Sequence, residues 1–157
     1  MLGNLANCPI ASNGIPKHTL AAMAHCKALV VDDIKEFRQF LSLTLPEKTD
    51  CEVVGEASDG LQAVALAERL QPDLILLDIG LPLLNGIRAA RRIRKLSPNS
   101  KILFFTQDSS REIAQGALET GATGYLLKSD ATDIVCAVQT VLRGEQFVSE
   151  RVKPASA

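Results

Sequence analysis

The feature that most constrains this chain is a regular alternation of short apolar runs with longer amphipathic stretches. The apolar runs lie at 28–31, 51–56, 73–77, 101–105 and 124–127. Helical patterns lie between and after them, at 34–45, 60–70, 85–96, 109–120 and 130–143. Strands that alternate with helices are typical of parallel sheets, because parallel neighbours are joined by a crossover connection. The pattern therefore predicts an α/β fold with a five-stranded parallel sheet and five helices.

Local signals support this interpretation. The runs at 74–77 and 102–105 are continuously apolar, as expected of strands that are buried on both faces. Gly121 follows the fourth helical pattern and is predicted to end that helix. Ser129 and Asp130 precede the fifth pattern and are predicted to cap its N-terminus.

The two ends of the chain lack this periodicity. Residues 1–26 contain one Lys, two His and several Gly and Pro residues, which predicts a poorly ordered N-terminal extension. His25 beside Cys26 could suggest a metal site, but such a site needs three or four converging ligands. The pattern predicts one domain over 27–145, followed by a C-terminal tail over 146–157.

Composition excludes several classes of function. The net charge of −1, the 4% aromatic content and the lack of Trp argue against a nucleic-acid-binding surface. No apolar run approaches the roughly 20 residues needed to span a bilayer, and no signal peptide is recognisable. The four cysteines form no CxxC pair, which favours free thiols in a reducing compartment. We therefore expect a cytoplasmic protein without membrane association.

Reactive side chains follow four of the five predicted strands. Asp32 and Asp33 follow the first strand, Asp78 the third, Thr106 the fourth and Lys128 the fifth. Each residue alone has an ordinary explanation, since an Asp after a strand usually forms a turn or caps a helix. Ligands of open α/β sheets bind beyond the carboxyl ends of the strands, however, so these side chains are predicted to form one site.

The residue types at this edge indicate the chemistry. Two carboxylates about 4 Å apart repel by roughly 4 kcal/mol at an effective dielectric constant near 20, so the cluster must take up protons or a cation. Ligands that are all oxygen suit Mg²⁺, and no His or Cys is present to favour zinc. A carboxylate can also act as a nucleophile and form an aspartyl-phosphate. Asp78, alone at the end of the central strand, is the candidate.

Four stretches of this sequence carry a resemblance to a known family. They are ALVVDDIKEFR, DLILLDIGLPLLNG, KILFFT and GATGYLLKSD. With these motifs the chain resembles the receiver domain of two-component response regulators, and the stretch GYLLK followed by Ser-Asp is most similar to the NarL/FixJ group. The resemblance covers about 27–145. It implies a flavodoxin-like, CheY-like fold with strand order 2-1-3-4-5.

The resemblance also implies a role for each candidate residue. Asp78 would accept a phosphoryl group from a histidine kinase or a histidine phosphotransfer protein. Mg²⁺ would be bound by Asp32, Asp33, Asp78 and the backbone carbonyl of Gly80. Such a domain is a phosphoacceptor that catalyses its own phosphorylation and dephosphorylation, and it is not an enzyme acting on a separate substrate.

Three further residues would bind or report the phosphoryl group. Thr106 would contact it, Lys128 would pair with one of its oxygens, and Tyr125 would act as an aromatic switch. Phosphorylation adds about −1.5 to −2 charges. The family expectation is that this charge alters the face formed by the helix at 109–120, the strand at 124–127 and the helix at 130–143. That face would then bind a protein partner or a second copy of the chain.

The sequence departs from the family pattern at several positions. Gln107 follows Thr106 where the family usually has a small residue, Ser129 follows Lys128 where many members have Pro, and Gly80 has no side chain to shield the site. Relatives of the NarL/FixJ group usually continue into a helix-turn-helix domain, and only a tail follows Glu145. We therefore expect a single-domain response regulator that does not bind DNA by itself, or a truncated relative of a NarL-type regulator.

Three alternatives remain. A degenerate receiver could act as a constitutive protein-binding module, although the intact set of Asp, Thr and Lys residues argues against this. A phosphatase of the haloacid dehalogenase type needs a second Asp two residues after the nucleophile, where this chain has Gly80. A flavin or dinucleotide protein is disfavoured because no G-x-G-x-x-G motif follows the first strand.

Overall fold

A parallel sheet forms the centre of the computed structural model, which describes residues 25–154. Its strands are β1 (Cys26–Val31), β2 (Cys51–Ala57), β3 (Leu74–Leu77), β4 (Lys101–Thr106), β5 (Gly124–Leu127) and β6 (Phe147–Val148). The strand order is β2-β1-β3-β4-β5-β6, and every neighbouring pair is parallel. The predicted order of the first five strands is confirmed, but the predicted number of strands is wrong, because the sheet within the described residues has six.

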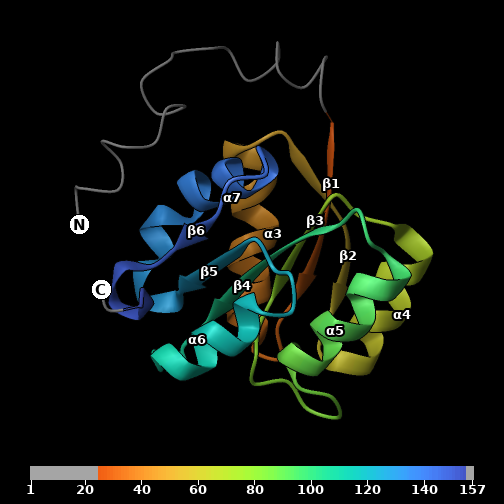
Figure 1. The fold of residues 1–157 in the computed structure, drawn as a ribbon. Coiled ribbons are helices and arrows are strands. Elements are labelled where there is room, and N and C mark those ends of the chain that lie inside the picture. Colours follow the sequence, from red (N-terminus) through yellow and green to blue (C-terminus); the bar gives the residue numbers. More distant parts are fainter. Residues whose placement is uncertain (1–24, 155–157) are drawn as a thin grey trace.

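Helices cover both faces of the sheet. They are α3 (Lys35–Lys48), α4 (Gly60–Leu70), α5 (Gly86–Leu96), α6 (Arg111–Leu118) and α7 (Ile134–Leu142). Helices α4, α5 and α6 pack on one face, whereas α3 and α7 pack on the other (Figure 1). The flavodoxin-like three-layer arrangement is therefore confirmed.

The core explains why the apolar runs are continuous. All four residues of β3 are fully buried. Successive side chains of a strand point to opposite faces. Accordingly, Ile75 and Leu77 pack with α4, α5 and α6, whereas Leu74 and Leu76 pack with α3 and α7. A central strand with helices on both faces has no position for a polar side chain until it ends, and Asp78 follows directly.

Polar caps and a glycine set the limits of the helices that position the site. The side chains of Asp59, Asn85 and Ser110 accept hydrogen bonds from backbone N–H groups in the first turns of α4, α5 and α6. Gly121 has a φ of +97° shortly after α6, as expected for a residue that ends a helix. These caps satisfy N–H groups that a helix cannot pair internally.

The chain leaves β5 differently from the prediction. The 3₁₀ helix η1 (Lys128–Asp133) precedes α7, so Ser129 and Asp130 lie inside η1 rather than capping the last helix. The predicted helix start at 130 is therefore wrong. Asp130 has a φ of −107° and a ψ of 28°, which places a kink between the strand and the helix.

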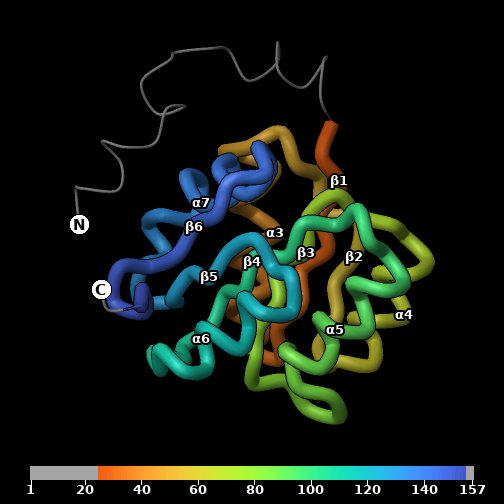
Figure 2. Tube along the Cα trace, viewed as in Figure 1, coloured from red at the N-terminus to blue at the C-terminus, as the bar shows by residue number. Residues whose placement is uncertain are grey.

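The segment expected to be a tail completes the sheet. Beta strand β6 pairs with β5, and the 3₁₀ helix η2 (Glu150–Val152) follows it (Figure 2). Val152 is 2% exposed and belongs to the core. The prediction for residues 1–26 lies outside the described residues except at His25 and Cys26. The longest helix between residues 25 and 154 has 14 residues, fewer than a helix needs to cross a bilayer.

Candidate functional site

Three carboxylates converge where β1 and β3 end. Asp32 and Asp33 follow β1, and Asp78 follows β3, its neighbour in the sheet. One oxygen from each carboxylate lies within 4.8 Å of an oxygen from the other two, and Asp32 and Asp78 are buried while Asp33 is exposed. The structure therefore brings together the three residues that the sequence placed at one edge. Their oxygen atoms form a set that suits Mg²⁺.

Lys128 enters this cluster from the end of β5. Its Nζ lies 2.8 Å from Oδ2 of Asp32 and 3.1 Å from Oδ2 of Asp78. The lysine side chain is 3% exposed, and its Nζ lies 4.0 Å from the centroid of the Phe37 ring. The aromatic face and the two carboxylates together stabilise a buried ammonium group. Lys128 thus contacts both Asp32, a candidate metal ligand, and Asp78, the candidate phosphoacceptor.

The cluster holds three carboxyl groups and a single lysine among the described residues. Burial raises the pKa of Asp32. The ion-pair contact with Lys128 and the hydrogen bond from the N–H of Ile34 act to lower this pKa. The N–H of Ile34 donates a 2.9 Å hydrogen bond to Oδ1 of Asp32. A buried carboxylate whose charged form is disfavoured gains stability from a nearby cation. The site therefore fits a divalent cation by charge as well as by ligand type.

An open hollow of about 420 Å³ lies beside the cluster. Its lining includes Asp33, Asp78, Gly80, Thr106 and Gln107. A Cβ added at Gly80 would meet no heavy atom within 4 Å, so this side of the hollow is unshielded. The backbone of Gly80 lines the hollow with the carboxylates, as the predicted carbonyl ligand requires.

Close packing of backbone holds Asp78 in place. The N–H of Ile79 donates a 2.8 Å hydrogen bond to Oδ1 of Asp78. A Cβ added at Gly86 would lie 2.0 Å from the carbonyl oxygen of Asp78, so only glycine allows α5 to start this close to β3. Sequence reasoning missed this role of Gly86, although an Asn-Gly pair before a helical pattern is a recognisable signal for a helix start.

Thr106 and Tyr125 are linked through the loop after β4. Thr106 is 2% exposed, and its Oγ1 accepts a 3.3 Å hydrogen bond from the N–H of Asp108. The carbonyl of Asp108 accepts a 2.7 Å hydrogen bond from the hydroxyl of Tyr125. Burial raises the pKa of the Tyr125 hydroxyl, and the nearby charges of Asp108 and Asp78 add to this effect. The phenol is therefore a neutral donor that connects β5 to the loop of Thr106.

Ser149 connects β5 to the last described segment. Its buried hydroxyl accepts a 2.9 Å hydrogen bond from the N–H of Leu127, and its N–H donates a 2.9 Å bond to the carbonyl of Tyr125. These two hydrogen bonds hold the backbone of β5 at Tyr125 and Leu127, immediately before Lys128. Sequence reasoning missed Ser149, because a serine after two apolar residues carries no signal for such a role.

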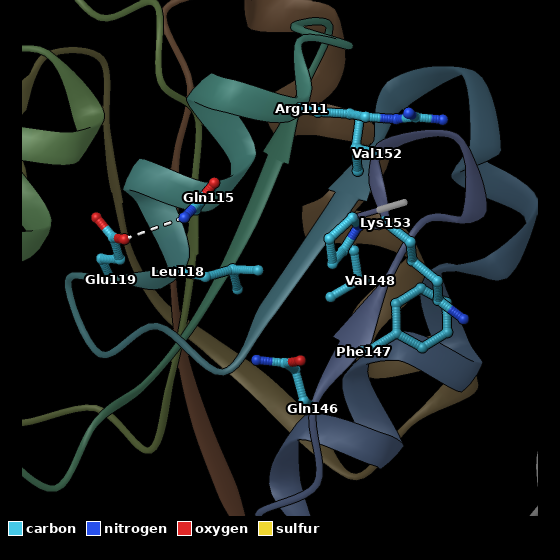
Figure 3. A pocket seen from close by; sticks show the side chains of 10 residues that line it. Arg111, Gln115, Leu118, Glu119, Gln146, Phe147, Val148, Val152 and Lys153 are labelled. Carbon is cyan, nitrogen blue, oxygen red and sulfur yellow. Dashed lines mark hydrogen bonds between the residues drawn. The ribbon is translucent and has the colours of Figure 1, made fainter. Parts of the chain in front are cut away.

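Gln107 lies at the rim of the site. It lines the hollow that contains Asp78 and also a neighbouring hollow of about 350 Å³ that contains Lys128 and Arg151. A larger hollow of about 820 Å³ lies away from the strand ends, between α6 and the segment that contains β6 and η2 (Figure 3). Leu118, Val148 and Val152 are among its apolar residues. It contains none of the candidate site residues.

Comparisons with known sequences agree with this geometry. The family model of the response regulator receiver domain matches residues 28–139. The nitrate/nitrite response regulator NarL of Escherichia coli K12 is 38% identical over 130 residues, which cover 82% of this chain and 60% of NarL. The response regulator VraR of Staphylococcus aureus NCTC 8325 is 38% identical over 127 residues, covering 80% and 61%. The chain thus spans about three fifths of the length of these relatives.

Solved structures agree as well. A LuxR-family two-component response regulator from Aurantimonas superposes with a TM-score of 0.77 at 32% identity, covering 82% of this chain and 93% of that chain. The receiver domain of the putative response regulator NarL from Mycobacterium tuberculosis gives a TM-score of 0.73 at 33% identity, covering 77% and 98%. With this fold, these strand-end residues and a matching family model, the chain belongs to the response regulator receiver domain family of two-component systems.

Proposed function

We propose that this chain is a response regulator that is phosphorylated on Asp78 by a histidine kinase or a histidine phosphotransfer protein. The observation that carries the proposal is the contact of Lys128 with both Asp32 and Asp78, at 2.8 and 3.1 Å, beside the exposed carboxylate of Asp33. An Asp oxygen attacks phosphorus, the bond between phosphorus and the donor histidine nitrogen breaks, and the imidazole leaves with a proton. The phosphoryl group passes directly from the histidine to Asp78, without a covalent intermediate on any other residue.

The residues around Asp78 hold it in position for this attack. The N–H of Ile79 restrains one oxygen of Asp78, and Lys128 contacts the other. The carboxylate lines the open hollow, which gives a donor access to it. Orientation of the acceptor and neutralisation of charge are the main protein contributions to phosphoryl transfer.

Asp32, Asp33, Asp78 and the carbonyl of Gly80 would hold Mg²⁺ in this reaction. The ion would offset negative charge on the phosphoryl oxygens and on the carboxylate cluster. Lys128 would exchange its contact with Asp78 for a phosphoryl oxygen, and the Thr106 hydroxyl would donate a hydrogen bond to another. Thr106 lines the same hollow as Asp78, and Lys128 contacts Asp78 directly, which supports these roles.

The hydrogen bonds that link Thr106, Asp108 and Tyr125 indicate how phosphorylation of Asp78 would change the surface of the protein. Movement of Thr106 toward the phosphoryl group would shift Asp108 and, through its carbonyl, Tyr125 on β5. The expected output face of α6, β5 and α7 also includes β6 and η2, because that segment lies against β5 and α6. We propose that this face binds a protein partner or a second copy of the chain in the cytoplasm, where cysteines without a disulfide, such as Cys26 and Cys51, are usual.

Intact-protein mass after incubation with acetyl phosphate and Mg²⁺ tests the acceptor. Wild type should gain one phosphoryl group, Asp78→Ala should gain none, and chelation of Mg²⁺ should abolish the gain. Asp73→Ala is a matched control, since Asp73 precedes the same strand at its opposite end and should leave the gain unchanged.

A negative result with acetyl phosphate needs a second probe, because Gln107 narrows the rim of the site. Beryllofluoride with Mg²⁺ mimics the phosphoryl group without requiring a transfer step. Failure of both probes on the folded wild type would overturn the proposal and favour a constitutive protein-binding module. A phosphoryl group retained on Asp78→Ala would move the acceptor to another residue.

A further inference from the structure

Two cysteines occupy the first positions of neighbouring strands. Cys26 begins β1, Cys51 begins β2, and the two are register partners in the parallel ladder. Cys26 is 7% exposed and Cys51 is 2% exposed. They lie at the end of the sheet opposite Asp32, which follows the last residue of β1. This pair plays no part in the proposed phosphorylation.

The two side chains share one packing environment. Both belong to the core cluster between the sheet and helices α3 and α7. Adjacent strands lie about 4.7–4.9 Å apart, within the range of about 4.4–6.8 Å that separates the Cα atoms of disulfide-bonded cysteines. Register partners in a parallel ladder also point to the same face of the sheet. A bond between the sulfurs therefore requires only a local adjustment.

The pair is accessible to small polar molecules despite its low exposure. Cys26 and Cys51 both line a hollow of about 440 Å³ at this end of the sheet, together with Asp50, Lys101 and Arg143. This hollow gives a small oxidant a route to the pair. Cys136, the third described cysteine, is buried and does not line this hollow.

Either thiol of the pair can be the first nucleophile. Cys26 and Cys51 line the same hollow, so an oxidant that enters it meets both residues. A thiolate is the reactive form of cysteine. The second thiol of the pair then resolves the intermediate that forms on the first.

We propose that Cys26 and Cys51 form a redox-active dithiol that hydrogen peroxide converts to a disulfide between β1 and β2. The sulfur of one cysteine attacks one peroxide oxygen, the O–O bond breaks, and the leaving hydroxide takes the thiol proton to give water. The sulfur of the other cysteine then attacks the sulfenic acid, the S–O bond breaks, and a second water leaves with the proton of that thiol. Two thiols and one peroxide thus give one disulfide and two water molecules.

Peptide mapping of the full chain tests this proposal directly. Trypsin places the four cysteines on four different peptides, at 1–17, 18–27, 49–69 and 129–143. The reduced protein is treated with hydrogen peroxide, alkylated and digested without reductant. We expect peptides 18–27 and 49–69 to appear as the dominant linked pair, and thiol reductant to separate them. Alkylated Cys26 and Cys51 after peroxide treatment, or equal linkage to Cys8 or Cys136, would overturn the proposal.

Single substitutions provide the controls. Cys51→Ala should abolish the linked pair, while Cys136→Ala, a change at another buried cysteine, should leave it intact. Circular dichroism verifies that each variant folds, and the wild-type map decides the matter if the Cys51 variant does not. The thermal midpoint of wild type should rise on oxidation and return on reduction, because a cross-link restricts the unfolded chain. A midpoint that stays at the value of the reduced protein, together with no linked pair in the peptide map, would overturn the proposal.

Discussion

The hydroxyl of Tyr125 donates a 2.7 Å hydrogen bond to the backbone carbonyl of Asp108, two residues beyond Thr106. The tyrosine is fully buried, and its ring centroid lies 6.1 Å from that of Phe104. This bond joins β5 to the loop between β4 and α6. Thr106, the candidate phosphoryl ligand, is the last residue of β4 and directly precedes this loop. The conformation of the loop and the position of the ring are therefore linked.

Tyr125→Phe removes this bond and keeps the ring. We expect the variant to fold, with a free energy of unfolding lower by about 1 kcal/mol near neutral pH, as for a typical intramolecular hydrogen bond. Urea denaturation followed by circular dichroism measures the change. An unchanged stability would show that the bond contributes nothing to the folded state.

Alkaline pH provides a second test of Tyr125. An unfolded tyrosine loses its proton near pH 10, whereas burial keeps the folded one protonated to higher pH. Above about pH 10 the folded state binds more protons, so the free energy of unfolding falls as pH rises. The difference in stability between wild type and Tyr125→Phe should shrink in this window. A difference that grows there would reverse the assigned direction of the shift.

Asp32→Asn should stabilise the chain when Mg²⁺ is absent. Burial raises the pKa of Asp32 in the folded state, so its contribution to stability falls as pH rises above the unfolded value of about 4. We expect a gain of roughly 0.5–2 kcal/mol at neutral pH, the range of common stabilising single substitutions, and weaker Mg²⁺ binding. Urea denaturation in chelator and a Mg²⁺ titration measure the two effects.

The acid range supplies the control for Asp32→Asn. Wild type and variant should converge below about pH 4, where the aspartate is neutral in both states. Lower stability of the variant at neutral pH would mean that the ion pair with Lys128 outweighs the cost of burial.

Gly86→Ala should destabilise the fold strongly. Its Cβ would lie 2.0 Å from the carbonyl oxygen of Asp78, so β3 or α5 must move. We expect a loss of roughly 1–3 kcal/mol or more and weaker Mg²⁺ binding. Gly116→Ala is the matched control, because no heavy atom lies within 4 Å of a Cβ added there in α6. That control should be neutral or stabilising, since alanine favours helix interiors.

Ser149→Ala should weaken the attachment of the last described segment. The change leaves the buried N–H of Leu127 without its hydrogen-bond acceptor, which costs about 1–3 kcal/mol. Ser109→Ala, at an exposed loop position, should have little effect. Hydrogen exchange of the Leu127 amide measures the local change. Unaltered protection of that amide would show that another group replaces the serine.

The sequence predicted those parts of the fold that depend on strong local patterns. The continuous apolar runs of β3 and β4 identify buried parallel strands, and Gly121 marks the end of α6. Strand β6 escaped prediction, because two half-buried residues have too little length to show a period. The kink at Asp130 also escaped, since the junction of β5, η1 and α7 depends on packing rather than on local propensity.

The candidate site likewise has residues that the sequence predicts and contacts that only the folded structure shows. Asp32, Asp33, Asp78, Thr106 and Lys128 could be found from sequence, because each lies at or just after the end of a recognisable strand. The contacts of Lys128 with two carboxylates, and the pairing of Cys26 with Cys51 in the ladder, depend on strand order and register. Neither is encoded by spacing along the chain, so only the assembled sheet makes them visible.

The short strand β6 also determines which edge of the sheet is open to other copies of the chain. Strand β5 consists of four buried residues, and without β6 its outer backbone groups would form an open sheet edge. Open edges with apolar residues act as templates for pairing between molecules. A chain cut after residue 145 would expose this edge and lose the Ser149 contact with Leu127. With β6 in place the outer strand has only two residues, and such a short edge offers few backbone groups for pairing between molecules.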